Sequence, residues 1–494
     1  MEIIESARPL YAILVSLAAV LLIGLSSKSP NIRESWTITA AVAKFIIVVS
    51  MLPAVLGGAV YEFNLLAVMP GLEIAFRVDA ISMFFGLTAS LLWIVTAFYC
   101  IGYMRTLKEH AQTRFYMCFA VALSAAMGIA FSANMFTLFI FYEILTLCTY
   151  PLVVHKETPE AVQGARRYLA YLLGTSIFFQ LTAILLTYFY AGTLEFAAGG
   201  ILAGTASNTV ITVIFLLFVF GIGKTAIMPF HAWLPSAMVA PTPVSALLHA
   251  VAVVKAGVYT LVKVVLYLFG VDLLQELGLG VVLACMASFT IIAASIIALR
   301  QDNLKMRLAY STVGQLSYVA LAVALLSPAG ITASLVHIMV HAFGKITLFF
   351  TAGAIYVATR KSKVSELDGI GKKMPFTMAA FTVGALSMIG MPPLAGFVSK
   401  WYMVMGAVEA QQLVFIGVIV LSSLLNAGYY LPIVYAAFFK PEPGGEDDGR
   451  LREAPAHMVA PLVFTAAGTL VLFMWPTLLL DLAGLVLDGV MGVN

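Results

Sequence analysis

Charged residues are scarce in this 494-residue sequence, where Asp, Glu, Lys and Arg together make up only 10%. Soluble globular chains carry about 25% charged and about 45–50% apolar residues, whereas this chain is 62% hydrophobic with a mean hydropathy of +1.01. Composition therefore excludes a water-soluble fold, and the apolar excess also excludes a disordered chain. The net charge of +3 is too small to indicate nucleic acid as a partner. The composition is that of a polytopic membrane protein.

Cysteine is also scarce. Cys100, Cys118, Cys148 and Cys285 lie far apart inside apolar runs, and no CxxC pair occurs. A disulfide framework, an iron–sulfur cluster and a zinc site therefore have no support, and we expect four buried, small apolar side chains. No motif for haem or flavin is present, so neither a cofactor nor a metal site is predicted. Residues 1–5 lack the basic region of a cleavable signal peptide, and we expect the first span to be retained.

Long apolar runs dominate the chain. A helix needs about 20 apolar residues to cross the hydrocarbon core, and charged residues divide the sequence into fourteen such runs. The predicted fold is an all-α polytopic membrane protein with one membrane domain over residues 1–494, and residues 479–494 are predicted to form an interfacial tail. The predicted spans are 9–27, 36–57, 80–103, 115–132, 134–154, 168–191, 208–228, 244–268, 277–299, 307–327, 330–358, 376–408, 412–438 and 456–478.

Lys and Arg residues are concentrated in every second connection between the predicted spans. The loops after odd-numbered spans hold 19 Lys and Arg residues, whereas the opposite loops and the termini hold 3. Because cytoplasmic loops are enriched in Lys and Arg, both termini are predicted on the non-cytoplasmic side of the cell inner (plasma) membrane. Residues 441–449 have the composition of a flexible linker.

Several ionisable residues remain inside the predicted spans. A charged group at the centre of a membrane helix costs about 2.5–3.5 kcal/mol or more, and an ion or proton path is the usual reason for keeping one. These residues are Lys44, Lys224, Lys255, Lys345 and Lys400, the carboxylate Glu143, and the histidines His249, His337 and His341.

Each of these residues also has a structural interpretation. Lys44 is expected to extend its ammonium to the headgroups. Lys255 has the alternative of binding a backbone carbonyl, and His249 that of a hydrogen-bonded core histidine. Glu143 and Lys224 have the alternative of a purely structural ion pair, although such pairs rarely add net stability.

His337, His341 and Lys345 follow one another at intervals of four residues. This spacing places them on one helical face over about 12 Å. Such a row, linked by water, has the geometry of a proton relay. A metal site at the two histidines is the competing interpretation, but no third ligand is evident nearby.

Proline and glycine interrupt two spans. Span 7 ends in Gly221–Pro229 and span 12 contains Gly390–Lys400; both helices are expected to break there because proline removes a helical hydrogen bond. Paired broken helices indicate a conduction site. Their positions predict two inverted five-helix repeats, spans 4–8 (residues 115–268) and spans 9–13 (277–438). Spans 1–3 (1–114) precede the repeats, and a loop, span 14 and the tail (439–494) follow them.

Three motifs resemble a known family. They are Phe141-Tyr142-Glu143, the run from Gly223-Lys224 to Pro235, and the run Ala240-Pro-Thr-Pro-Val-Ser-Ala-Leu-Leu-His249. They resemble the antiporter-like subunits of respiratory complex I, Mrp-type cation/proton antiporters and membrane-bound hydrogenases. The resemblance covers nearly the whole chain.

The resemblance implies roles for individual residues. Glu143 matches the span 5 glutamate that pairs with the span 7 lysine, Lys224. Lys255 and His249 match linking positions on span 8, and His337, His341 and Lys345 match the central relay on span 11. Lys400 matches the terminal group on span 12. Because complex I's middle subunit has glutamate there, Lys400 indicates instead a resemblance closest to the D-type Mrp subunit, with its relatives in hydrogenase-like complexes as the alternative.

The resulting hypothesis is a proton-translocating subunit of a multisubunit complex, with cation/proton antiport as an option. Separation of Glu143 from Lys224 would release a proton through Lys255 and the span 11 row towards Lys400. Expected partners are other antiporter-like and small membrane subunits, the lipid bilayer and protons, with sodium as a second ion; no redox or hydrolytic site of its own is predicted. The alternatives are a stand-alone transporter of a small solute and a scaffold subunit with a vestigial channel.

Overall fold

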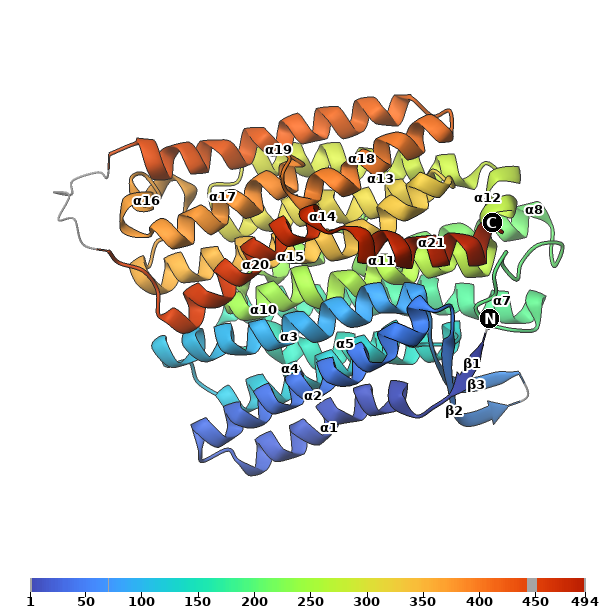
Figure 1. Cartoon of the computed structure of the whole chain (residues 1–494), viewed down its shortest axis with the longest axis horizontal. Coiled ribbons are helices and arrows are strands. Elements are labelled where there is room, and N and C mark those ends of the chain that lie inside the picture. The colour runs from blue at the N-terminus through green and yellow to red at the C-terminus, as the bar shows by residue number, and fades with distance from the viewer. Residues whose placement is uncertain (1, 70, 442–450, 493–494) are drawn as a thin grey trace.

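The computed structural model describes residues 2–69, 71–441 and 451–492. Most of these residues form long, roughly parallel helices, and both chain ends lie at the same end of the bundle, opposite α16 (Figure 1). The predicted linker lies outside the described residues except for Pro441. The α-helices are α1 (Arg8–Leu25), α2 (Pro30–Leu56), α3 (Ala80–Thr106), α4 (Gln112–Ala130), α5 (Met135–Val153), α6 (Pro159–Thr175), α7 (Leu181–Ala191), α8 (Asn208–Gly221), α9 (Trp233–Ser236), α10 (Thr242–Ala246), α11 (Val253–Lys263), α12 (Val271–Glu276), α13 (Leu279–Leu299), α14 (Leu304–Ala324), α15 (Pro328–Thr359), α16 (Ile370–Lys373), α17 (Pro375–Ile389), α18 (Ala395–Glu409), α19 (Val414–Phe439), α20 (Ala456–Met474) and α21 (Thr477–Met491).

Eleven helices in the described part of the chain are long and apolar enough to cross a membrane. The predicted multi-pass helical fold is therefore confirmed. Two further apolar helices, α8 and α17, have only 14 and 15 residues. They end at the two predicted interruptions: a 3₁₀ turn, η2 (Gly223–Thr225), follows α8, and α17 is separated from α18 by Gly390–Leu394. Both breaks predicted from proline and glycine are thus present.

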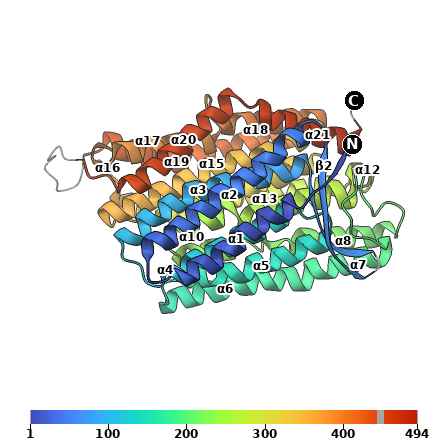
Figure 2. The same cartoon turned by 60° about the horizontal axis from the view of Figure 1, so that its bottom comes forward.

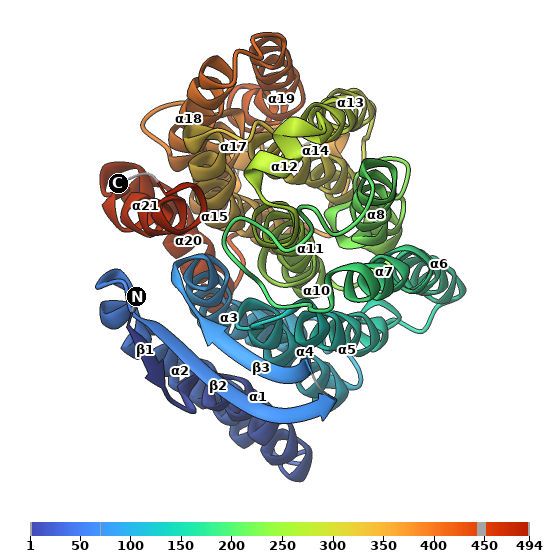
Figure 3. The same ribbon diagram turned by 90° about the vertical axis from the view of Figure 1, so that its right-hand side faces the viewer.

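A small sheet at the end that holds the chain termini was not predicted. It consists of β1 (Ile3–Glu5), β2 (Val60–Met69) and β3 (Leu72–Val78). β1 pairs with β2 in parallel, and β2 pairs with β3 antiparallel. The sheet lies beside α1 and α2 in the end-on view (Figure 3). The predicted spans 36–57 and 80–103 leave residues 58–79 as a connection without assigned structure.

The helix α15 forms the centre of the molecule. Its most apolar 18-residue window is completely buried. In the end-on view, α11 and α15 lie between a flank made by α1 and α2 and a flank made by α18 and α19 (Figure 3). Groups carried by α11 and α15 are therefore shielded from the lipid by the other helices.

Three π-helical stretches interrupt spans that were predicted as continuous helices. They are η1 (Ser176–Gln180), η4 (Leu247–Val251) and η5 (Val264–Phe269). η1 joins α6 to α7, whereas η4 and η5 flank α11. π-Helical turns are rare in proteins, and those that do occur are often found at functional sites. One of them, η4, carries His249.

Two details differ from expectation. The predicted interfacial tail forms α21, which continues the line of α20 along the bundle (Figures 1 and 2) and packs against α3 and α15. Its buried residues, among them Leu479, Leu482 and Val486, form one stripe, and Asp481 and Asp488 face away from it. The four cysteines are free, but only Cys100 is buried and Cys285 is exposed.

Candidate functional site

The first ionisable group lies where α8 breaks. Lys224 belongs to η2 and is completely buried. Its Nζ donates hydrogen bonds to the backbone oxygen of Tyr142 (2.8 Å) and to Thr146 Oγ1 (2.7 Å), and it lies 3.0 Å from the centroid of the Tyr142 ring. α5 thus supplies three partners for one ammonium.

Glu143 lies on the same turn of α5 as these partners. Its side chain is partly exposed, and its Oε1 is buried without a hydrogen-bond partner. Within the described residues no ion pair of 4 Å or less joins Glu143 to Lys224. The structure therefore brings the two residues into one neighbourhood without a direct contact, and Lys224 is held by the residues before and after the carboxylate.

A glycine lets Lys224 approach the next helix. Gly257 of α11 lies against the backbone of Lys224, and a Cβ added there would lie 2.3 Å from the Lys224 carbonyl carbon. Any larger side chain would force the two segments apart. Two residues earlier on α11, Lys255 is also completely buried.

Lys255 contacts the central helix. Its Nζ lies 2.5 Å from His341 Nδ1, and both side chains are buried, with exposed fractions of 0% and 1%. His341 and His337 follow each other along α15, with ring centroids 5.9 Å apart. The predicted row on span 11 therefore lies on one helix and meets span 8 directly.

His337 connects this row to α18. Its Nδ1 is 2.8 Å from Ser399 Oγ. The Nε2 atoms of His337 and His341 are buried without a protein partner. In the part of the chain that the structure describes, no third metal-ligating side chain joins the two histidines, which gives no support to a metal at this pair.

His249 lies beside the row without joining it by a hydrogen bond. It sits in η4, and both of its ring nitrogens are buried without a partner among the described residues. Its ring packs on Phe349 of α15 at a centroid distance of 4.7 Å. Buried imidazole nitrogens without protein partners are the kind of group that internal water satisfies.

Lys345 ends the row on α15. Its Nζ donates to Ser311 Oγ at 2.7 Å and to Tyr430 OH at 3.1 Å. Ser311 also lies 2.8 Å from Tyr429 OH, and Tyr429 OH donates to Asn426 Oδ1 at 2.5 Å. A hydroxyl and amide network thus leads from Lys345 into α19.

The network continues to the neighbourhood of Lys400. Asn426 Nδ2 donates to Tyr318 OH at 3.4 Å, and the Tyr318 hydroxyl lies 2.5 Å from Ser422 Oγ. Lys400 Nζ lies 4.8 Å from the centroid of the Tyr318 ring and donates to Ser423 Oγ at 2.8 Å. These bonds bring the two lysines into one polar region.

The second helix break positions Lys400. Gly390 follows α17 with φ +93°, a left-handed conformation that favours glycine. The preceding Ile389 oxygen accepts a hydrogen bond from Lys400 Nζ at 2.8 Å. A carbonyl at the end of a helix carries partial negative charge, so this position favours an ammonium. Both breaks therefore place a lysine in the interior.

Comparison with known proteins now identifies the family. Residues 132–426 match the family described as NADH:quinone oxidoreductase/Mrp antiporter, TM. The chain belongs to this family. The matched residues include both broken helices and all eight of the predicted site residues.

Individual relatives extend the match. Subunit N of NADH-quinone oxidoreductase from Desulforudis audaxviator is 35% identical over 408 residues, which cover 79% of this chain and 78% of that protein. Subunit L from Mycobacterium tuberculosis is 32% identical over 421 residues, covering 81% of this chain and 63% of that protein. The chloroplast subunit 5 of Zygnema circumcarinatum is 32% identical over 348 residues, covering 67% of this chain and 48% of that protein. The chain thus spans about half the length of this last relative.

Two solved structures share the fold. A chain of the Mrp complex from Dietzia sp. DQ12-45-1b gives a TM-score of 0.87 at 23% identity, covering 98% of this chain and 97% of that chain. A chain of the membrane-bound sulfane sulfur reductase, an archaeal respiratory membrane complex, gives 0.88 at 25% identity, covering 97% and 98%. The fold of this antiporter-family chain therefore occurs in two multisubunit membrane complexes.

Lys44 requires a correction. We expected its ammonium to reach the headgroups, but the side chain is completely buried. Its Nζ donates to the Leu123 backbone oxygen at 2.8 Å and lies 4.8 Å from the centroid of the Trp93 ring. Lys44 therefore ties α2 to α4 and takes no part in the network around α15.

Lys263 was counted among the loop residues, yet it lies inside α11. Its Nζ is 3.6 Å from Asp79 Oδ2, and its side chain is 1% exposed. A cavity of about 480 Å³ lies beside the pair, lined among others by Arg77, Glu195 and Tyr267. This ion pair, in which the lysine is buried and the aspartate is partly exposed, was not predicted from the sequence.

The polar partners of the lysines were also missed. Serine, threonine and tyrosine are common in membrane helices, and sequence alone gives them no special weight. Only two of these partners could have been suspected from the sequence, because they lie close to a predicted site residue. Thr146 lies about one turn after Glu143, and Ser399 directly precedes Lys400. The partners that the structure adds are Tyr142, Thr146, Ser311, Tyr318, Ser399, Ser422, Ser423, Asn426, Tyr429 and Tyr430.

Proposed function

We propose that this chain is a proton-translocating subunit of a multisubunit membrane complex. The observation that carries the proposal is the contact between Lys255 and His341 in the buried centre. Burying several ionisable groups is costly, and these two lie within proton-transfer distance of each other. The neighbouring imidazole nitrogens without protein partners support a chain completed by water.

The transmembrane arrangement completes the proposal. We propose fourteen crossings, in which α6 with α7, α8 with η2, α10 with α11, α17 with α18 and α20 with α21 each form one crossing. The position of both termini at one end of the bundle supports an even number (Figure 1). The basic loops then place the end that carries α16 in the cytoplasm. Residues 115–268 and 277–438 form the two inverted repeats, each with its broken helix in the fourth crossing.

Proton movement starts at the break of α8. Lys224 keeps its proton through hydrogen bonds to the Tyr142 oxygen and Thr146. The nearby carboxylate of Glu143 adds an attraction of about 4 kcal/mol when it comes within 4 Å at an effective dielectric of 20. A change in the Glu143 position or protonation therefore switches Lys224 between holding and releasing its proton. Water carries the proton onwards to Lys255, because no hydrogen bond among the described residues joins the two lysines.

The second part of the proposed proton path runs along α15. From Lys255 the proton reaches His341, and the row continues in one direction to His337 and Ser399 and in the other to Lys345. The hydroxyl and amide network then leads from Lys345 to the region of Lys400. His249, next to Phe349 of the same helix, adds a titratable group beside the row.

The chemistry of the interior favours protons over sodium. Sodium, like other hard cations, prefers several oxygen ligands, whereas the groups along α15 are amines and imidazoles. An ammonium also repels a metal cation. Exchange of sodium for protons by the complex therefore requires a separate cation route.

The experiment replaces Lys224 in the intact complex. Lys224→Ala removes the ammonium that Tyr142 and Thr146 hold, and we expect at least a tenfold loss of coupled proton movement in proteoliposomes with normal assembly. Lys44→Met removes an equally buried lysine outside the network and is expected to retain transport. Transport at the wild-type rate in Lys224→Ala contradicts the proposal.

Two further measurements separate the rival functions. Solute transport by the purified single chain in liposomes would indicate a stand-alone transporter. Undiminished ion movement with Glu143→Gln would indicate a scaffold, because a vestigial channel does not need the carboxylate. We expect neither result.

A further inference from the structure

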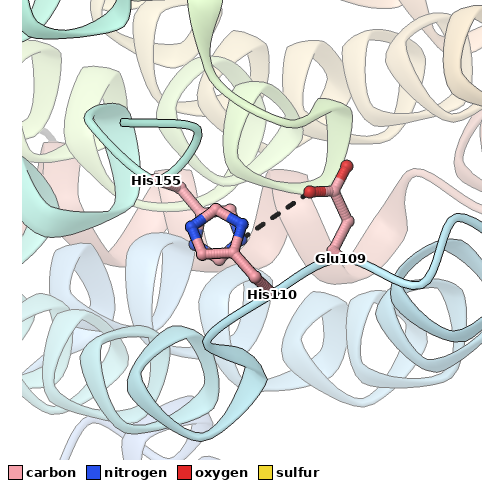
Figure 4. A group of neighbouring side chains, drawn as sticks. All are labelled: Glu109, His110 and His155. Carbon is pink, nitrogen blue, oxygen red and sulfur yellow. Dashed lines mark ion pairs between the residues drawn. The ribbon is translucent and has the colours of Figure 1, made fainter. Parts of the chain in front are cut away.

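A cluster of nitrogen and oxygen ligands lies outside the network around α15. Glu109 and His110 follow α3, and His155 follows α5 (Figure 4). One carboxylate oxygen and one nitrogen from each imidazole lie within 4.8 Å of one another. Both segments belong to the loops that the basic-residue pattern assigns to the cytoplasm.

The three side chains face one another. His155 Nε2 lies 3.9 Å from Glu109 Oε2, and the rings of His110 and His155 stack with centroids 4.8 Å apart. Figure 4 shows the Glu109 carboxylate directed at the edge of the stacked rings. Two loops separated by about 45 residues thus bring their ligand atoms within 4.8 Å of one another.

His155 is the group that needs a partner. Its side chain is completely buried, and neither ring nitrogen has a hydrogen-bond partner in the described structure. A buried polar group without a partner costs about 1–3 kcal/mol. These unpartnered ring nitrogens are the atoms that a bound ion would satisfy.

We propose that Glu109, His110 and His155 bind a zinc ion. Two imidazoles and one carboxylate are a ligand set that zinc takes with bonds of about 2.0–2.2 Å, leaving a fourth position for water. Ligand atoms of a tetrahedral zinc lie roughly 3.4 Å apart at these bond lengths, so rotations of the two loop side chains close the present spacing. Magnesium and calcium prefer oxygen ligands and suit this set poorly.

The surrounding charges define the fourth position. Glu157 Oε1 lies 3.8 Å from His110 Nε2, but it also forms an ion pair of 2.7 Å with Arg114. Because the Glu157 carboxylate is already paired with Arg114, it is not counted as a zinc ligand. Water then takes the fourth position. The basic residues Arg114 and Lys156 lower the affinity for a cation, which makes a modest, reversible site.

Zinc would join the ends of two helices. His110 lies between α3 and α4, whereas His155 lies two residues after the end of α5, the helix that carries Glu143. A bound ion therefore restrains the cytoplasmic end of α5 against the loop between α3 and α4. The site itself contains none of the residues assigned to proton movement.

The test measures zinc binding to the purified, chelator-treated full chain by calorimetry. We expect one zinc ion per chain, bound reversibly with modest affinity, and at least a tenfold weaker affinity for His110→Asn and for His155→Asn, because each removes one ligand. His110 is about half exposed, so its variant is expected to fold even if the buried His155 variant does not. His457→Asn replaces an exposed histidine at the start of α20 and is the matched control.

Thermal unfolding gives a second readout. A ligand that binds only the native state raises its stability, so zinc is expected to raise the melting temperature of the wild type and of His457→Asn but not of His110→Asn. Wild-type protein that binds no zinc at 100-fold excess overturns the proposal. An affinity unchanged by His110→Asn and by Glu109→Gln also overturns it.

Discussion

Lys255 Nζ and His341 Nδ1 lie 2.5 Å apart in an interior that excludes lipid. One of the two groups must donate a proton to the other at this distance. Two full positive charges would repel by about 4 kcal/mol or more at an effective dielectric of 20, so at most one of the two groups is charged. Because α11 and α15 belong to different proposed repeats, this contact connects the two halves of the molecule.

The serine next to Lys345 is expected to matter for transport. Ser311→Ala removes the hydroxyl that accepts from Lys345 and contacts both Tyr429 and Tyr430. Hydrogen bonds to charged groups contribute about 1.5–3 kcal/mol, so we expect about a tenfold slower proton movement in proteoliposomes. Ser317→Ala on the same helix is the control, since among the described residues Ser317 Oγ donates only to the Val313 oxygen of its own helix. Equal rates for the two variants would exclude Ser311 from the path.

A single methyl group at Gly257 is expected to displace Lys224. Gly257→Ala places a Cβ 2.3 Å from the Lys224 backbone, and crowding of a packed interior costs about 1–3 kcal/mol. We expect a lower melting temperature together with reduced proton movement. Gly174→Ala in α6 is the control, because nothing lies within 4 Å of its added Cβ. A Gly257 variant that behaves like the Gly174 variant would mean that α11 and η2 do not depend on this contact.

The ion pair between Lys263 and Asp79 is expected to stabilise the fold. Lys263→Met leaves the Asp79 carboxylate without the ammonium that pairs with it. Losing one partner of such an ion pair lowers the free energy of unfolding by about 3 kcal/mol. Lys440→Met breaks an exposed pair with Asp368 and is expected to cost at most about 1 kcal/mol. Thermal unfolding compares the two variants. The double variant Asp79→Asn with Lys263→Met is expected to recover part of the loss, and no recovery would show that the charges are not coupled.

The sequence identified most of the ionisable residues of the site, but not which of them are in contact. Lys224, Lys255 and His341 were found because ionisable groups inside apolar spans are costly and therefore conspicuous. The contact between Lys255 and His341 was not predictable, because helix periodicity does not determine which faces of distant spans meet. The same reasoning placed Lys44 at the headgroups, whereas packing against Trp93 and Leu123 holds it inside.

Irregular backbone was predictable only where proline or glycine marks it. The interruptions at Gly221–Pro229 and Gly390–Lys400 followed from proline, which cannot continue a helix. The π-helical stretch around His249 has no such mark, because its residues also suit an ordinary helix. The position of α21 was not predicted either. Asp481 and Asp488 suggested a helix at the membrane interface, but the apolar stripe on its other face packs against α3 and α15.

The most direct test of the account is proton movement by the complex that carries Lys255→Met. The substitution approximately keeps the length of the side chain and removes the amine that contacts His341. We measure proton uptake by sealed proteoliposomes and compare the wild type, Lys255→Met and the charge-preserving Lys255→Arg, with assembly checked for each. The account predicts at least a tenfold loss for Lys255→Met and also for Lys255→Arg, because a guanidinium keeps its charge but does not release its proton. Wild-type proton uptake by assembled Lys255→Met complexes would contradict it.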